Sequence, residues 1–177
     1  MDMCDRCSKG QPFPIGATLT DGGVNFAVYS ENAKRIFLEF YNEASDSEPS
    51  MTFCLDSEYN RSGSIWHCFV KGASAGQLYL YRAEGEYAPE KGLRFDSEAH
   101  LFDPYAKAFT EGSVFKAYRM ARAAGQNINT GSVEMPEVCN RADMRIFPKC
   151  VVVDDSFDWE YDRPLQIPLR DSVIYEM

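Results

Sequence analysis

Histidine is scarce in this 177-residue sequence, and basic residues are fewer than acidic ones. His67 and His100 are the only histidines, so a catalytic pair of nucleophile and histidine base has few residues to draw on. Lysine and arginine number 18 against 27 aspartates and glutamates, which gives a formal net charge of -9. A surface of this sign repels polyphosphates, and we therefore expect no nucleic-acid partner.

Long apolar runs are also missing from the sequence. No stretch approaches the roughly 20 apolar residues that a membrane-spanning helix needs, so we expect no membrane partner. The first residues are polar and lack the apolar core of a secretion signal, which predicts a cytoplasmic location with mostly reduced cysteines. Hydrophobic residues make up 45% and aromatic residues 14%, which suffices for the core of one compact domain.

Two groups of residues are weak candidates for a metal site. Cys4 and Cys7 form a C-x-x-C pair, but tetrahedral zinc needs four ligands. A dense acidic cluster lacks the fixed spacing of a calcium-binding loop and consists of Asp154, Asp155, Asp158, Glu160 and Asp162. We expect a frayed terminus and a solvated linker at these places, and no metal or other cofactor.

The first 85 residues alternate between apolar and polar side chains, with turn residues between the runs. This pattern predicts five antiparallel strands, at residues 24–30, 35–41, 51–56, 65–71 and 78–84. The spacing of the first two strands suggests a hairpin, and the last two are joined by the glycine-bounded loop 72–76. Strands at such intervals without intervening helices predict a mainly β domain, an antiparallel β-sandwich with short helical insertions.

The pattern changes after Gly85. Asp103 and Pro104 predict the start of a short helix that ends at Phe109, and a second helix is expected over residues 113–125. Residues 126–147 carry little periodicity, and residues 149–154 predict a return strand. We therefore divide the chain into a flexible N-terminus (1–9), a sandwich (10–110), a helical and irregular extension (111–154) and a linker with the first strand of a missing second domain (155–177).

Several blocks of the sequence are similar, in order and spacing, to bacterial glycogen debranching enzymes and isoamylases. The blocks are residues 10–18, 23–33, 79–87, 92–95, 101–107, 148–159 and 171–177. The resemblance implies an immunoglobulin-like (early-set) sandwich of carbohydrate-binding module family 48, placed before a (β/α)8 barrel of glycoside hydrolase family 13. Such barrels hydrolyse α-1,6 branch linkages by a retaining mechanism with two carboxylates. A barrel needs about 250 residues, so we assign no catalytic residue here and expect the chain itself not to be an enzyme.

Candidate residues for α-glucan binding follow from the aromatic content. Trp66, Tyr79 and Tyr81 would share one face of two strands if those strands pair, although the same residues suit a sandwich core. Related glycogen-binding modules place an aromatic contact in the loop region that holds Tyr87, Arg94 and Phe95 here, and these residues could instead anchor the barrel.

The loop of residues 42–50 departs from the family, because glycogen-binding relatives carry a tryptophan near this place and the loop here has no aromatic residue. We therefore expect weak glucan binding, if any. Docking on the barrel would cover apolar side chains that are otherwise exposed, and the candidates are Leu101, Phe102, Tyr105, Phe109 and Trp159. Two functions stay open: a glucan-binding module, and a structural or interface domain without a sugar of its own.

Overall fold

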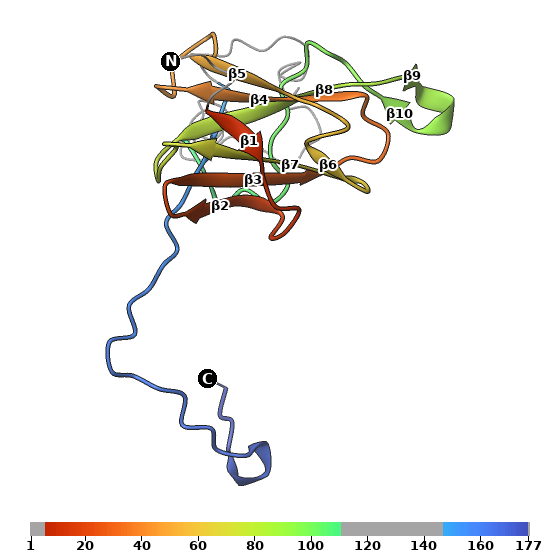
Figure 1. Cartoon of the computed structure of the whole chain (residues 1–177). Helices are drawn as coiled ribbons and strands as arrows, with labels where there is room; N and C mark the ends of the chain where they lie inside the picture. Colours follow the sequence, from red (N-terminus) through yellow and green to blue (C-terminus); the bar gives the residue numbers. More distant parts are fainter. Residues whose placement is uncertain (1–5, 111–146, 177) are drawn as a thin grey trace, which may run out of the picture.

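The computed structural model describes residues 6–110 and 147–176. Its antiparallel β-sheets stack as a sandwich (Figure 1). The first sheet has the order β1-β7-β3-β2, and a short strand β6 also pairs with β7. Its strands are β1 (Cys7–Lys9), β2 (Gly16–Thr20), β3 (Gly23–Tyr29), β6 (Arg61–Ser62) and β7 (Ile65–Lys71).

The second sheet has the order β11-β12-β8-β4-β5. Its strands are β4 (Arg35–Tyr41), β5 (Met51–Leu55), β8 (Leu78–Glu84), β11 (Ala108–Phe109) and β12 (Cys150–Val151). A two-stranded ribbon of β9 (Tyr87–Ala88) and β10 (Leu93–Arg94), with the 3₁₀ helix η2 (Pro89–Lys91) between them, projects from one end of the sandwich (Figure 1). No helix among the described residues is long and apolar enough to cross a membrane.

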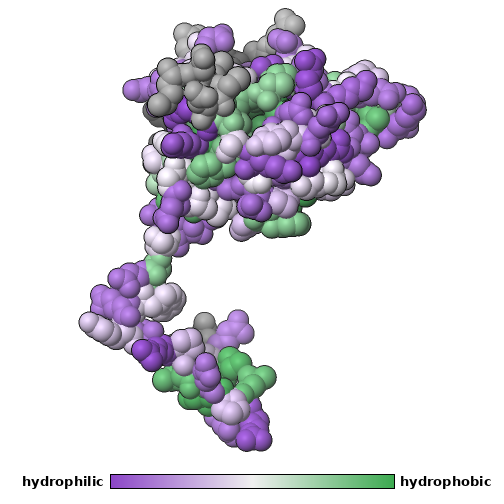
Figure 2. Space-filling model, in the orientation of Figure 1, coloured by the Kyte–Doolittle hydropathy of each residue, from purple (hydrophilic) through white to green (hydrophobic). Residues whose placement is uncertain are grey.

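The C-terminal residues 154–176 leave the sandwich as an extended segment whose side chains are all exposed (Figure 1). Its one regular element is the 3₁₀ helix η3 (Leu169–Asp171). Hydrophobic side chains gather on this segment (Figure 2), and they include Leu165, Ile167, Val173 and Ile174. The described residues of the predicted barrel strand, up to Glu176, have no strand partner, so that strand stays a prediction.

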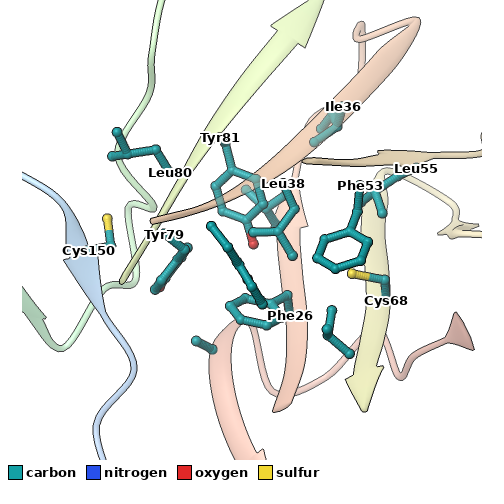
Figure 3. Packing of buried hydrophobic residues seen from close by; sticks show 14 of the residues in the cluster. Phe26, Ile36, Leu38, Phe53, Leu55, Cys68, Tyr79, Leu80, Tyr81 and Cys150 are labelled. Carbon is teal, nitrogen blue, oxygen red and sulfur yellow. The ribbon is translucent and has the colours of Figure 1, made fainter. Parts of the chain in front are cut away.

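The core lies between the two sheets, because alternate residues of each strand point inward. On β4, Ile36, Leu38 and Phe40 face the core, and on β8 the inward residues include Tyr79 and Tyr81 (Figure 3). Ring contacts join the sheets: the Phe26 ring of β3 lies 5.5 Å from the Phe40 ring and 5.1 Å from the Tyr79 ring. Burial of this aromatic cluster holds the two layers face to face.

The predicted β-sandwich is confirmed, and the five predicted strands lie within one residue of β3, β4, β5, β7 and β8. The predicted hairpin between the first two is wrong. β3 pairs with β2 and β7, whereas β4 pairs with β5 and β8 in the other sheet. The intervening residues 30–34 therefore cross from one sheet to the other. Residues 72–77 make a second crossing of this kind, between β7 and β8.

Other predicted elements differ from the structure. The helix over residues 104–109 is wrong, because Pro104 and Tyr105 form a turn and Ala108–Phe109 pair with β12. The return strand is shorter than expected and covers only Cys150–Val151. Cys7–Lys9 form an edge strand on β7 instead of belonging to a flexible N-terminus. The helix predicted over residues 113–125 lies outside the described residues.

Candidate functional site

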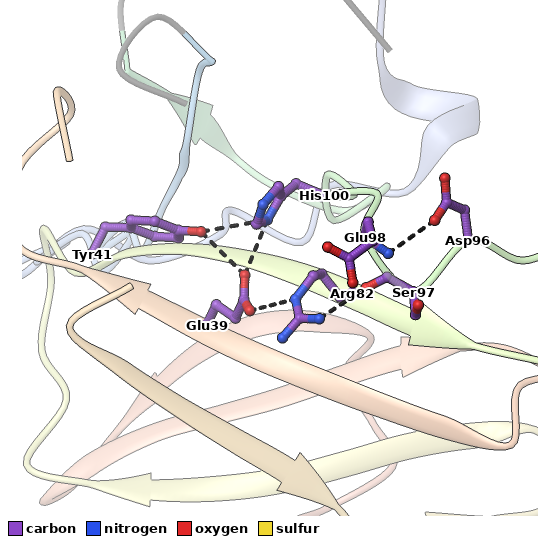
Figure 4. Close-up of polar contacts among 7 residues, drawn as sticks. All are labelled: Glu39, Tyr41, Arg82, Asp96, Ser97, Glu98 and His100. Atoms are coloured by element: carbon purple, nitrogen blue, oxygen red, sulfur yellow. Dashed lines mark hydrogen bonds and ion pairs between the residues drawn. The ribbon is translucent and has the colours of Figure 1, made fainter. Parts of the chain in front are cut away.

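Residues 95–103, which we call the crossing segment, pass the outer face of β4 and β8 at Ser97 and His100, and Leu101 then pairs with Tyr81 at the edge of β8. The Glu39 carboxylate of β4 is 1% exposed and binds two groups there: Arg82 Nε at 2.5 Å and His100 Nδ1 at 3.1 Å (Figure 4). The Tyr41 hydroxyl donates to the same carboxylate at 3.1 Å. Arg82 also donates to the carbonyl oxygen of Ser97 at 2.8 Å. Glu39 and Arg82 of the sheet therefore both bind the crossing segment, through His100 and Ser97 respectively.

The charge of Glu39 is stabilised by these contacts. Burial raises the pKa of the Glu39 carboxyl, but hydrogen bonds from His100 and Arg82 and the positive charge of Arg82 outweigh it, so the pKa lies below its ordinary value. An ionised Glu39 in turn fixes His100 over the sheet. The outer face at this point is therefore filled by the chain's own side chains.

The crossing segment ends at Asp103, a second carboxylate that is 1% exposed. Its oxygens accept hydrogen bonds from the Tyr79 hydroxyl and the Tyr105 N–H, both at 2.8 Å, and its own N–H donates to Cys150 Sγ at 3.4 Å. Burial raises the pKa of Asp103, and these two hydrogen bonds offset only part of that effect. Asp103 has neutral partners, whereas Glu39 faces an arginine. This is why the pKa of Asp103 is raised while the pKa of Glu39 is lowered.

A groove of about 390 Å³ opens at the end of the sandwich where the crossing segment begins. One wall is the end of β3 and the residues after it, and the other is β10 and the residues after it. The walls consist of Tyr29, Ser30, Glu31, Asn32, Leu93, Arg94, Phe95 and Asp96, with Ala83, Gly92, Ala99 and Leu101 completing the lining. A smaller pocket of about 160 Å³ shares Tyr29, Phe95 and Leu101 with this end groove and continues it.

The first wall of the end groove is held by the core. The indole Nε1 of Trp66 donates to the carbonyl oxygen of Ser30 at 3.0 Å. Arg61 donates to the carbonyl oxygen of Glu31 at 2.8 Å, and its guanidinium lies 5.1 Å from the centre of the Trp66 ring. Trp66 and Arg61 therefore fix the backbone from which the Glu31 and Asn32 side chains project.

The second wall is held by packing at Gly85. A Cβ atom on Gly85 would lie 2.4 Å from Phe95 Cδ2, so only glycine lets the Phe95 ring approach this closely. Asp96 closes a turn by accepting the N–H of Glu98 at 2.9 Å, and Arg82 binds the next carbonyl, that of Ser97. Both walls are therefore fixed before a ligand arrives.

The structure contradicts three of the predicted glucan contacts. Trp66 and Tyr79 are fully buried and Tyr81 is 3% exposed, so no sugar reaches these rings. They do not form one face either, because β7 and β8 belong to different sheets. The other three candidates come together: Arg94 and Phe95 line the end groove, and Tyr87, 71% exposed, lies opposite Arg94 in the β9-β10 ribbon.

The prediction from sequence missed the residues of the first wall. Tyr29 is 57% exposed although it ends the otherwise buried strand β3. Glu31 and Asn32 follow it in a stretch that the sequence marks only as a turn. One feature of the sequence could have indicated this wall. Tyr29, the last residue of the apolar run, is followed by three polar residues, which is where a strand is expected to leave the core.

The predicted docking residues are all exposed, but they form more than one group. Leu101, Phe102 and Phe109 lie along the crossing segment and β11, where the Phe102 ring stacks on Phe147 at 4.8 Å and meets Phe109 at 5.2 Å. Tyr105 lies against Gly16 of β2. Trp159 lies on the extended C-terminal segment, where its ring contacts Phe157.

The described residues contain no group of three or more His, Cys, Asp or Glu side chains that could hold a metal ion. Cys7 is part of β1, and Cys4 lies outside the described residues. Within the acidic cluster, Asp155 instead pairs with Lys107 at 2.6 Å. Two places in the described residues are therefore open to a partner: the end groove, and the exposed apolar patch of Leu101, Phe102 and Phe109.

Comparison with known proteins agrees with this architecture. The protein named Isoamylase 1, chloroplastic, from Oryza sativa subsp. japonica is 35% identical over 174 residues, which cover 97% of this chain and 19% of the rice protein. The glycogen debranching enzyme of Yersinia enterocolitica is 34% identical over 170 residues, 96% of this chain and 23% of that enzyme. The chain thus spans about a fifth of the length of the curated relatives it matches.

Among solved structures, the product complex of SpuA, a multi-modular glycogen-degrading pneumococcal virulence factor, superposes with a TM-score of 0.52. The match covers 83% of this chain and 12% of SpuA at 15% identity, and it shows a shared fold alone. The family model for carbohydrate-binding module 48, the isoamylase N-terminal domain, matches residues 14–106. Because this match covers more than half of the sequence, the chain belongs to the carbohydrate-binding module 48 family of isoamylase N-terminal domains.

Proposed function

We propose that this chain is the N-terminal α-glucan-binding domain of a debranching enzyme whose remaining part hydrolyses α-1,6-glucosidic branch linkages. The observation that carries the proposal is the family match, together with relatives named isoamylase and glycogen debranching enzyme that align over nearly the whole chain. The domain's part is to hold glycogen, amylopectin or maltooligosaccharides weakly, without catalysis of its own. We also propose a cytoplasmic location for the enzyme.

Glucan binding by the domain is tested by electrophoresis of the 177-residue chain in native gels with and without glycogen. We expect the glycogen to retard the chain relative to a protein of similar charge that binds no sugar. Equal mobility in both gels at all glycogen concentrations would contradict binding. The activity of the full-length enzyme is tested separately, by release of linear chains from amylopectin and absence of hydrolysis of unbranched amylose.

A second function, docking on the catalytic part, is favoured by the exposed apolar patch of Leu101, Phe102 and Phe109. Exposed rings in mutual contact are typical of a surface that another domain covers. In the full-length enzyme, Phe102→Asp with Phe109→Asp should lower the unfolding temperature and increase proteolysis between the domains, and Tyr59→Asp should do neither. Tyr59 is a suitable control because it is 53% exposed and lies elsewhere. Unchanged stability of the double variant would contradict docking through this group.

A further inference from the structure

We propose that the end groove between Tyr29–Asn32 and Leu93–Asp96 is the site where this domain holds an α-glucan chain. The class of ligand, an α-glucan, rests on the proposed function. The location of the site is inferred from the structure. The resemblance points only to the loop of Arg94 and Phe95 at one wall, and the structure brings Tyr29–Asn32 to the other wall. The location is therefore argued from shape, side-chain chemistry and rigidity.

The size of the end groove suits a small ligand. Its volume of about 390 Å³, continued by the pocket of about 160 Å³, falls within the range of roughly 300–1,000 Å³ that small-molecule sites occupy. The groove is open to solvent. An oligosaccharide chain can therefore enter it.

The side chains in the end groove match the two kinds of surface that a glucose ring presents. Pyranose rings have apolar C–H faces, and the Tyr29 ring at one wall and Phe95 at the other offer apolar area to them. Hydroxyl groups around the ring both donate and accept hydrogen bonds. Glu31 and Asp96 accept, Arg94 donates and the Asn32 amide does both.

Electrostatics disfavour an anionic or an apolar ligand in the end groove. Two carboxylates, Glu31 and Asp96, stand there with one guanidinium, Arg94. A phosphate or another anion would meet two like charges, and an apolar ligand would leave these groups without water or partner. A neutral polyhydroxyl compound satisfies donors and acceptors together.

Rigidity also distinguishes this place from other exposed surfaces of the domain. The Ser30 and Glu31 carbonyls are held by Trp66 and Arg61, and Phe95 is seated against Gly85. Binding then costs little ordering of the protein, which matters for a ligand with few contacts. By contrast, His100 and the crossing segment already fill the outer face beside Glu39.

The test is an NMR titration of the 177-residue chain with maltoheptaose, on the native protein and on matched tyrosine variants. Tyr29→Ala removes the ring from the groove wall, and Tyr59→Ala removes a similarly exposed ring that contacts Lys9 instead. Tyr29→Phe keeps the ring and loses only the hydroxyl. Asn32→Ala provides a second groove variant if Tyr29→Ala fails to fold.

We expect amide shifts confined to residues 29–32 and 92–96. The dissociation constant should rise about tenfold or more in Tyr29→Ala, as for a central contact residue. It should stay within about twofold in Tyr59→Ala and Tyr29→Phe. Saturable shifts at other residues would overturn the groove as the site and leave glucan binding by the domain intact. The absence of shifts anywhere at millimolar sugar would overturn both proposals.

Discussion

On the outer face of β4 and β8 the crossing segment lies directly against the sheet, whereas at the end of the sandwich its first residues stand away from β3 and leave the groove open. Glu39 and Tyr41 on the closed face are each 1% exposed, but Tyr29 at the open end is 57% exposed. The crossing segment thus covers the outer face of β4 and β8 and also forms one wall of the end groove. A ligand can reach the sheet only where the side chains of the crossing segment do not contact it.

The same contrast separates the aromatic residues. Trp66, Tyr79 and Tyr81 fill the space between the sheets, whereas Tyr29 lines the end groove and Tyr87 is exposed on the β9-β10 ribbon. Rings of one chemical type therefore stabilise the fold at one place and are available to a ligand at the other. The variants below separate these two roles, beginning with the largest effect on the free energy of unfolding.

Trp66→Ala should lower the free energy of unfolding by about 3–5 kcal/mol, because it leaves a large cavity and removes the hydrogen bond to Ser30. Tyr87→Ala, at a 71% exposed position, should change it by no more than about 0.5 kcal/mol. Urea unfolding of both variants gives the comparison. A small effect at Trp66 would mean that its ring is not part of the core.

Gly85→Ala should destabilise the chain by about 1–3 kcal/mol, since the added methyl group would collide with the Phe95 ring and displace one wall of the end groove. Phe95→Ala should relieve the collision. In a double-mutant cycle measured by urea unfolding, the combined variant should therefore lose less stability than the sum of the single variants. Strict additivity would show that Gly85 and Phe95 do not contact each other.

Glu39→Gln should cost about 1–3 kcal/mol at neutral pH, because the hydrogen bonds to Arg82 and His100 lose their charged acceptor. Glu84→Gln is the control: Glu84 also pairs with an arginine, Arg35 at 2.6 Å, but both side chains are partly exposed, and its loss should stay below about 1 kcal/mol.

The cost of Glu39→Gln should also depend on pH. The folded-state pKa of Glu39 is lowered, so its contribution is complete above the unfolded-state pKa of about 4.3 and is lost as the pH falls through the lower folded value. The difference between native protein and variant should therefore shrink in acid. A constant difference in urea unfolding from neutral pH to acid would contradict the assigned charge pair.

Asp103→Asn should have a small effect, within about 1 kcal/mol at neutral pH, because an amide keeps the size of the side chain and still accepts the Tyr105 N–H. The raised pKa of Asp103 gives the opposite sign to that of Glu39. Native stability from this group rises as the pH falls through the raised folded pKa toward the ordinary value of about 3.9. The Asn variant should lack this rise, and an identical pH profile in the two proteins would contradict the assignment.

Local patterns were sufficient to predict five strands of the sandwich, but not the edge strand β2. Alternation along residues 24–30 or 78–84 depends only on neighbouring residues, and β3 and β8 follow it within one residue. Strand pairing is not local. Consecutive strands such as β3 and β4 show the same alternation whether they form a hairpin or cross between sheets, which is why the hairpin prediction failed.

The helix predicted from Asp103 and Pro104 failed for a tertiary reason. Asp103 does accept the N–H of Tyr105, as a helix cap would, but its second oxygen binds Tyr79 and Phe109 pairs with Cys150. Contacts to two strands thus replaced the next helical turn. The end groove was partly predictable, since Arg94 and Phe95 came from the resemblance, but Tyr29 meets them only through folding.

A crystal structure of the 177-residue chain with maltoheptaose tests the contrast between the closed face and the open end most directly. We predict sugar rings between the Tyr29 side chain and Arg94, with His100 still bound to Glu39 and the crossing segment unmoved. Sugar bound on the outer face of β4 and β8, with the crossing segment displaced, would contradict the account.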